Sequence, residues 1–119
     1  MFDIEKFRSY CLKKKGVSEE FPFGPETLVF KVAGKMFALT GLDSDEFSIN
    51  LKCNAEQMVD WRSKYPAVQP GYHMNKAHWN TVLIDGSIRQ KEIEGMIDHS
   101  YDEVVRGMTK KMRQELNNL

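Results

Sequence analysis

The sequence predicts an α+β protein in which an antiparallel sheet packs against helices. Three short segments with alternating apolar side chains follow one another closely, and such short connections require antiparallel pairing. Segments with helical periodicity flank this group instead of alternating with single strands. The 119 residues contain 41% hydrophobic and 29% charged residues, which is typical of one globular domain spanning 1–119.

The N-terminal segment predicts a helix of about three turns. One face of this helix carries the apolar residues Ile4, Phe7, Cys11 and Leu12. Asp3 is placed to cap its start, and Gly16 is placed for a left-handed cap at its end. The next stretch, VSEEFPFGPE, contains two prolines and predicts an irregular connection into the sheet.

The three predicted strands occupy residues 27–32, 35–40 and 47–53. Ala33 and Gly34 provide a tight turn between the first two strands. The apolar residues expected on their inward faces are Leu28, Phe30 and Val32 in the first strand and Phe37 and Leu39 in the second. The third strand has the clearest alternation, and its predicted core face carries Phe47, Ile49, Leu51 and Cys53. The other face of the third strand is expected to be wet.

A second helix is predicted to begin after Asn54, an N-cap residue, with Gln57 placed to complete a capping box. Its stripe carries Met58, Trp61, Arg62 and Tyr65, and Pro66 ends it. After a polar loop, residues 79–85 predict a buried strand that closes in a turn at Gly86.

The longest helix follows, with a sustained period of 3.6 residues. Its apolar face carries Ile93, Met96, Ile97, Tyr101, Val104, Val105 and Met108. Gly107 interrupts this pattern, and Thr109 caps a short final helix. The predicted order is therefore helix, three strands, helix, strand, long helix and short C-terminal helix.

The composition also predicts the cellular compartment and limits the kinds of binding partner. No segment approaches about 18 apolar residues, and the charged N-terminus does not resemble a signal peptide, so we expect a cytoplasmic protein without a membrane partner. Cys11 and Cys53 lie apart, which favours reduced thiols. Seventeen basic and seventeen acidic residues give zero net charge, so a nucleic-acid partner would need a local basic surface. No heptad pattern argues for assembly, and a monomer is expected.

The polar loop and the long helix carry a resemblance to a known family. The stretch PGYHMNKAHWNTVLIDG, followed by IDHSYDEVV, resembles the MmcQ/YjbR family, whose signature here consists of Tyr72, His73, Asn75, Lys76, His78 and Trp79. Asp85, Gly86, Ser100 and Tyr101 extend this signature, and the resemblance covers essentially the whole chain. It implies a YjbR/CyaY-like sandwich similar to frataxin, described for this family as a double-wing DNA-binding domain. Family members are generally of unknown function.

The loop allows two interpretations. As a binding site, Lys76 and His78 would contact phosphates, while Tyr72 and Trp79 would stack on bases or shape the pocket. Arg89 and Lys91 are further candidates for phosphate contacts. As a structural brace, Trp79 would be core, Asn75 would satisfy loop backbone groups, and His73 and His78 would bond to carbonyl groups. Both roles can hold together, since a loop must be fixed before it can present side chains.

Metal, cofactor and catalytic sites are not expected. His73 and His78 match no standard zinc spacing, and no nucleotide-binding glycine pattern is present. The basic end of the first helix also argues against the iron binding that a frataxin-like fold would suggest. His99 and Ser100 are adjacent on a helix, so their side chains point about 100° apart and do not form a dyad.

We therefore expect a non-enzymatic binding module whose first candidate partner is DNA or another nucleic acid. The alternatives are a protein-interaction module that uses an exposed sheet face or groove, and then a small-ligand binder. The sequence also contains two basic clusters. The first consists of Lys13, Lys14 and Lys15, and the second of Arg106, Lys110, Lys111 and Arg113. Each cluster either serves the end of a helix or joins the other in one basic surface.

Overall fold

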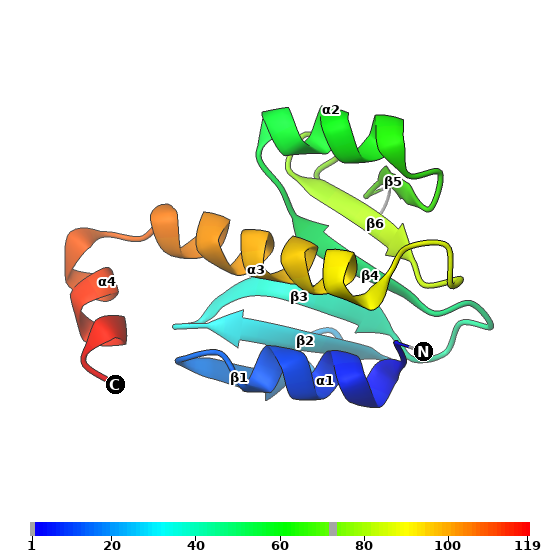
Figure 1. Ribbon diagram of the computed structural model, residues 1–119. Coiled ribbons are helices and arrows are strands. Elements are labelled where there is room, and N and C mark those ends of the chain that lie inside the picture. The colour runs from blue at the N-terminus through cyan, green and yellow to red at the C-terminus, as the bar shows by residue number, and fades with distance from the viewer. Residues whose placement is uncertain (1, 72–73) are drawn as a thin grey trace.

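The chain folds around one antiparallel sheet in a computed structural model that describes residues 2–71 and 74–119. The elements are α1 (Ile4–Leu12), β1 (Val17–Glu20), β2 (Thr27–Val32), β3 (Lys35–Gly41), β4 (Ser48–Lys52), α2 (Ala55–Lys64), β5 (Val68–Pro70), β6 (Trp79–Leu83), α3 (Gln90–Arg106) and α4 (Lys110–Asn117). The six strands have the order β1-β2-β3-β4-β6-β5. Helices α1, α2 and α3 lie on one side of the sheet, and α4 lies beyond the end of α3 (Figure 1). The predicted α+β class is confirmed.

Three of the helices begin at the predicted capping residues. The side chain of Asp3 accepts a hydrogen bond from the backbone of Lys6 at 2.9 Å at the start of α1. Asn54 caps α2 in the same way, and Thr109 caps α4. The predicted capping box in α2 is wrong, because the backbone N–H of Asn54 donates to His99 Nε2 at 3.2 Å instead of to Gln57.

The predicted cap of α1 at Gly16 is also wrong. The helix ends at Leu12, and Lys13 follows in a right-handed conformation. Gly16 lies in the turn into β1 with a φ of 75°, in the left-handed region that favours glycine. A Cβ atom at this position would lie 2.4 Å from Cδ1 of Leu116, so Gly16 allows α4 to approach the body of the protein.

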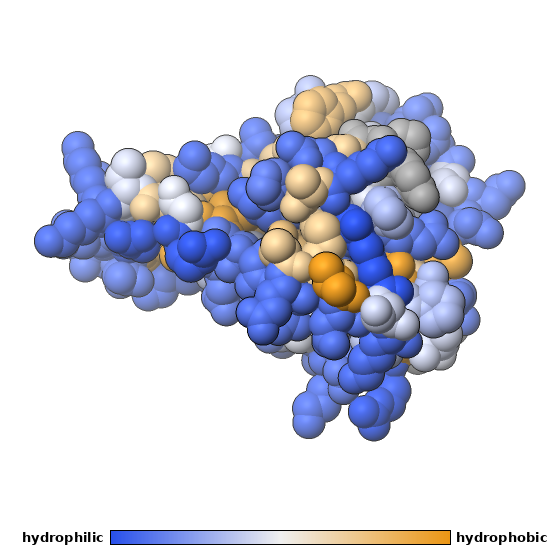
Figure 2. All heavy atoms as spheres, turned by 90° about the horizontal axis from the view of Figure 1, so that it is seen from above, coloured by the Kyte–Doolittle hydropathy of each residue, from blue (hydrophilic) through white to orange (hydrophobic). Residues whose placement is uncertain are grey.

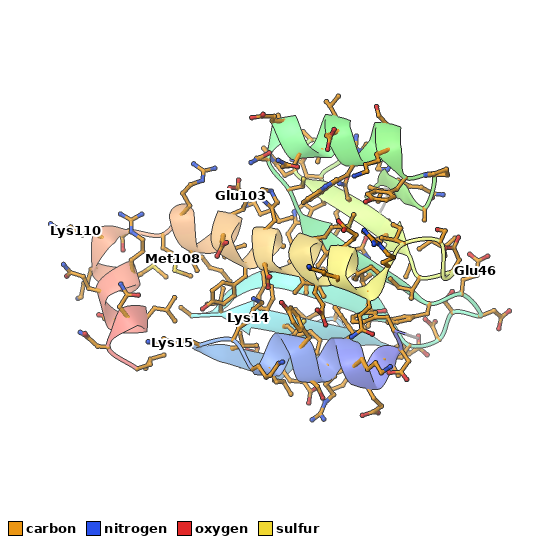
Figure 3. All side chains as sticks on the ribbon, in the orientation of Figure 1. Lys14, Lys15, Glu46, Glu103, Met108 and Lys110 are labelled. Atoms are coloured by element: carbon orange, nitrogen blue, oxygen red, sulfur yellow. The ribbon has the colours of Figure 1, made fainter. Side chains whose placement is uncertain are left out.

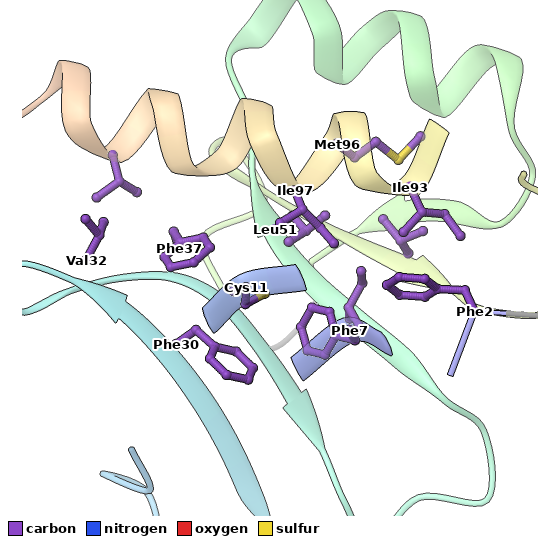
Figure 4. Packing of buried hydrophobic residues seen from close by; sticks show 14 of the residues in the cluster. Phe2, Phe7, Cys11, Phe30, Val32, Phe37, Leu51, Ile93, Met96 and Ile97 are labelled. Carbon is purple, nitrogen blue, oxygen red and sulfur yellow. The ribbon is translucent and has the colours of Figure 1, made fainter. Parts of the chain in front are cut away.

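The main core fills the space between the helices and one face of the sheet, as Figure 4 shows. The rings of Phe7 and Phe30 meet edge to face with centroids 5.4 Å apart. Phe37 and Ile97 are fully buried in the same cluster. Burying a side chain of this size contributes roughly 1.5–3 kcal/mol to folding, so the apolar faces of α1, β2, β3 and α3 that meet in this cluster each stabilise the fold.

Two short edge strands were not predicted. β1 lies within the segment expected to be irregular, and it pairs with β2 from Val17 opposite Val32 to Glu20 opposite Val29. Two consecutive charged residues, Glu19 and Glu20, interrupt the alternation of apolar and polar side chains that would predict a strand. In the structure they form ion pairs with Arg8 and Lys31. β5 has only three residues and ends at a proline, which edge strands tolerate. Both strands depend on a neighbouring strand and carry little local signal.

A β-bulge in β3 overturns the prediction that Phe37 and Leu39 share a face. Phe30 pairs with Ala38, whereas the next residue, Lys31, pairs with Met36. Phe37 is therefore an extra residue, and both Phe37 and Ala38 face the main core. Leu39 consequently points to the opposite face of the sheet.

That opposite face is not entirely wet. Val29, Leu39 and Trp79 are buried there in a second, smaller cluster, with Met36 and Met74 packed against it. Met74 belongs to the polar loop between β5 and β6, so the loop covers this part of the sheet. The predicted wet face of β4 remains partly exposed at Ser48 and Asn50.

Candidate functional site

The loop between β5 and β6 is closed at its base by backbone hydrogen bonds. Gly71 donates to the carbonyl of Trp79 at 3.0 Å. Inside the loop, the carbonyl of Asn75 accepts from the backbone of His78 and of Trp79. The side chain of Asn75 accepts from the backbone of Ala77 at 2.9 Å, so this amide supports the loop itself. The described part of the loop is a compact turn with a defined shape.

Arg62 of α2 fastens this loop to the rest of the fold. Its Nη2 donates to the carbonyl of Lys76 at 2.8 Å and to that of Trp79 at 3.2 Å. Its Nε donates to the buried Asn80 side chain at 2.8 Å. A guanidinium group has five N–H donors in one rigid plane and holds these three acceptors at fixed positions, whereas the three donors of lysine lie on one nitrogen at the end of a flexible chain. The sequence pattern predicts Arg62 only on the packing stripe of α2 and does not indicate this contact.

Trp79 is a structural residue. It is 9% exposed and packs against Val29 and Leu39 on the second face of the sheet. The base-stacking role considered for Trp79 does not fit, because stacking needs an accessible ring face. Its other predicted role, shaping the neighbouring surface, agrees with this position.

The remaining predicted site residues divide into two groups. Asn75, Lys76 and His78 are exposed on the loop. Tyr72 and His73 lie outside the described residues. Arg89 and Lys91, the further phosphate candidates, are exposed at the start of α3. They lie at the other end of this helix from Arg106, so the structure does not bring them to the same place as His78.

His78 borders a cavity of about 330 Å³ that sequence analysis did not find. The backbone N–H of Cys53 donates to the carbonyl of His78 at 2.8 Å and joins the loop to the end of β4. The cavity is lined by Lys52, Cys53, Asn54, Ala55, Ala77, His78, Glu103, Arg106 and Gly107. We call it the α2–α3 cavity, since it lies between the start of α2 and the end of α3.

The charges around this cavity are mainly positive. Lys52 and Arg106 line it together with His78, and Glu103 is the one acidic residue among its described lining residues. Arg106 holds the carboxylate of Glu103 through two hydrogen bonds, the shorter of them 2.8 Å, and this lowers the pKa of Glu103. The first residues of α2 add the positive end of a helix dipole. Because Arg106 already pairs with Glu103 and Glu56 lies in the first turn of α2, Lys52 is the main cation of this cavity for an anion.

The side chains of His99 and Ser100 have structural partners. His99 Nε2 accepts the backbone N–H of Asn54, and burial lowers the pKa of this imidazole. The hydroxyl of Ser100 donates to the carbonyl of Phe37 and accepts from the backbone of Lys52 at 2.8 Å. The hydroxyl of Ser100 and the ring of His99 are therefore bonded to the backbones of different segments, and the geometry provides no nucleophile and base pair.

The two cysteines are buried and carry free thiols. Burial raises the pKa of Cys53 to about 12 and also raises the pKa of Cys11. Neither thiol is activated as a nucleophile, which would need a lowered pKa. Within residues 2–71 and 74–119, no three His, Cys, Asp or Glu side chains are grouped as metal ligands.

Most of the side chains in the two basic clusters are engaged with their own fold. Lys14 pairs with Asp98, and Lys15 donates to the carbonyl of Asn117 at 3.2 Å. Arg113 donates to the last carbonyl of α3, at Arg106, and to the carbonyl of Met108 in the turn that follows. These contacts favour the interpretation that the clusters serve helix ends. Figure 3 shows Lys15 and Lys110 toward one end of the molecule and Glu46 at the other, with Lys14 nearer the middle.

The fold and the loop define a small α+β protein with a single antiparallel sheet. The polar loop between β5 and β6 is held to this sheet by Arg62. The YjbR family model matches residues 12–103, and the chain belongs to the YjbR family.

Relatives and solved structures agree with this family. The uncharacterized protein YbdF of Escherichia coli O157:H7 is 38% identical over 91 residues, which cover 76% of this chain and 75% of YbdF. The uncharacterized protein YjbR of Escherichia coli strain K12 is 29% identical over 113 residues, 95% of this chain and 96% of YjbR.

Among solved structures, a crystal structure of the Deinococcus radiodurans protein DR2400, with the domain DUF419, has a TM-score of 0.90 and 38% identity. The aligned region covers 98% of this chain and 89% of the DR2400 chain. A protein from Pseudomonas syringae has a TM-score of 0.74 and 32% identity, covering 86% of this chain and 98% of its own.

Proposed function

We propose that this chain is a non-enzymatic, cytoplasmic nucleic-acid-binding module that contacts phosphates through Lys76, His78 and the rim of the α2–α3 cavity. The observation that carries the proposal is the convergence of cationic side chains there. Lys52 and Arg106 line the same cavity as His78, and the loop with Lys76 is fastened beside it by Arg62. Phosphate oxygens are the ligands that such a surface favours. The double-wing DNA-binding fold that the family resemblance implies agrees with this assignment.

The proposal specifies how the nucleic acid is recognised. Trp79, one of the two predicted stacking residues, is buried, and Tyr72, the other, lies outside the described residues. The cationic side chains of the described site suit contacts to the nucleic-acid backbone, which carries little sequence information. We expect binding that depends steeply on salt and weakly on sequence.

The test is a salt titration with fluorescent duplex DNA, single-stranded DNA and RNA, followed by anisotropy. Lys76→Gln and Lys52→Gln should each weaken binding and lower the slope of log affinity against log salt by about 1. Lys91→Gln is the matched control, because Lys91 is exposed at the opposite end of α3 and should leave affinity and slope unchanged. Failure of all three nucleic acids to bind at low salt, or an equal effect of Lys91→Gln, would overturn the proposal.

A further inference from the structure

A second concave surface lies at the start of α1, on residues that the proposed function does not use. It is a cavity of about 400 Å³ between the first residues of the chain and the loop that joins β3 to β4. Its apolar lining consists of Phe2, Ile4, Leu42, Phe47 and Ile84. Leu42 is 46% exposed, so a large apolar side chain faces solvent at this cavity.

The cavity continues into a neighbouring one and forms an elongated groove. Phe2 and Ile84 also line the second cavity, of about 230 Å³, which reaches Ile88 and Ile93 at the start of α3. Two apolar hollows that share a wall suit an extended chain with spaced side chains better than a compact molecule. We call the two together the acidic groove, for the charges at its rim.

The rim of the larger cavity is negative, whereas the smaller cavity is lined by Arg89, which pairs with Glu92. Asp3 and Asp45 line the larger cavity, and Asp43 and Glu46 belong to the same exposed loop. In the part of the chain that the structure describes, none of these four carboxylates forms an ion pair, although five pairs occur elsewhere. Unpaired carboxylates beside an apolar surface favour cationic side chains and disfavour phosphates.

We propose that the acidic groove binds an extended basic peptide segment of a partner protein. An apolar side chain of that segment would lie against Leu42 and Phe47, and its lysine or arginine side chains would lie beside Asp45 and Glu46. This surface is distinct from the α2–α3 cavity, whose charge has the opposite sign. Figure 3 shows Glu46 at the end of the molecule away from Lys15 and Lys110.

The test uses a short synthetic peptide of lysine residues with one central leucine, titrated into the isotope-labelled full chain and followed by amide chemical shifts. Shifts should map to Leu42, Phe47 and Ile84. A matched peptide with serine in place of leucine should bind about tenfold more weakly, because it loses the buried apolar contact. A peptide with glutamate in place of lysine should not bind, owing to the acidic rim.

Variants of the protein assign the effect to the groove. The double variant Asp45→Asn with Glu46→Gln should weaken binding several-fold, and Leu42→Ser should abolish the preference for the leucine peptide. Asp60→Asn is the matched control, since Asp60 is an exposed carboxylate on α2 without an ion pair in the described part of the chain. Equal affinity for the leucine and serine peptides, or an equal effect of Asp60→Asn, overturns the proposal. Groove shifts that grow with protein concentration alone would identify a second copy of the chain as the occupant, and would overturn it as well.

Discussion

His99 joins two helices through a single nitrogen atom. Nε2 accepts the backbone N–H of Asn54 at the start of α2, and the ring meets Trp61 edge to face at 5.2 Å. A backbone N–H can only donate, so Nε2 must be unprotonated and the proton of the neutral ring must lie on Nδ1. Burial lowers the pKa of His99, while the nearby carboxylates of Glu103 and Asp102 act in the opposite direction.

This contact predicts a loss of stability on mild acidification. The unfolded chain binds a proton at His99 near the ordinary pKa of about 6.5, whereas the folded chain binds it only at lower pH. The stability contributed by His99 is therefore complete above about pH 6.5 and decreases as pH falls below that value. Urea unfolding should show a lower free energy of unfolding at about pH 5.5 than at about pH 7.5.

The variant His99→Gln is the control, because its amide oxygen can still accept the Asn54 N–H and does not titrate. Its free energy of unfolding should vary less over the same pH range than that of the parent. Equal pH dependence in both proteins would exclude His99 as the group responsible.

At the scale of elements, α3 connects the other segments through consecutive residues. Asp98 accepts hydrogen bonds from Tyr10 of α1 and from Lys14, which follows α1. Ser100 bridges β3 and β4, and the hydroxyl of Tyr101 donates to the carbonyl of Lys15 at 2.6 Å. The stretch that carries part of the family resemblance thus has a packing role in this chain. Its partners are distant in sequence, so periodicity revealed the buried face of α3 but not these bonds.

The docking of α4 depends on the absence of a side chain at Gly16. Gly16→Ala would place a Cβ atom against Leu116 and would force a positive φ on alanine, which is unfavourable by about 1–2 kcal/mol. We expect this variant to lower the free energy of unfolding and to increase amide exchange throughout α4.

Gly34→Ala is the matched control for this prediction. Gly34 has a φ of 82°, and no atom lies within 4 Å of a Cβ built there. It should therefore show the backbone effect without faster exchange in α4. If Gly16→Ala and Gly34→Ala behave alike, the contact with Leu116 is not what holds α4.

At the scale of the whole molecule, the sheet is covered on both faces to different extents. Three helices cover one face, whereas the second face has a small cluster beneath the β5–β6 loop. Viewed from the side of α2, the surface is mainly hydrophilic with small hydrophobic areas (Figure 2). No helix within the described residues is long and apolar enough to span a membrane.

The second cluster predicts the effect of removing Trp79. Trp79→Ala should lower the free energy of unfolding by about 3 kcal/mol, because a large ring is removed from a buried position. Val59→Ser is a surface control, since Val59 is 70% exposed on α2, and it should change stability by no more than about 0.5 kcal/mol. Urea unfolding at constant pH measures both. A Trp79→Ala protein that unfolds like the parent would show that the second cluster contributes no stability.

How much of the structure the sequence predicts depends on how far apart in the sequence the interacting residues lie. Caps such as Asp3 and Asn54 act within three residues and were predicted from local chemistry. β1 and β5 exist through pairing with other strands and left no clear pattern. At the candidate site, the exposed loop was predicted, but Arg62 and Lys52 were not assigned to it. Their roles depend on bringing α2 and β4 beside the loop, which no spacing in the sequence indicates.

The bulge at Phe37 has a consequence for changes in chain length. The two-residue turn at Ala33 and Gly34 would, with uninterrupted pairing, place Leu39 on the face of the helices. The extra residue separates the register at the turn from the register farther along β3. Deleting Phe37 would leave both registers in place and remove one ring from the core. Deleting Ala38 would also keep both registers, because Phe37 would then lie opposite Phe30 and Leu39 would stay opposite Val29. An inserted residue would instead enlarge the bulge, so insertions and deletions in this hairpin are not equivalent.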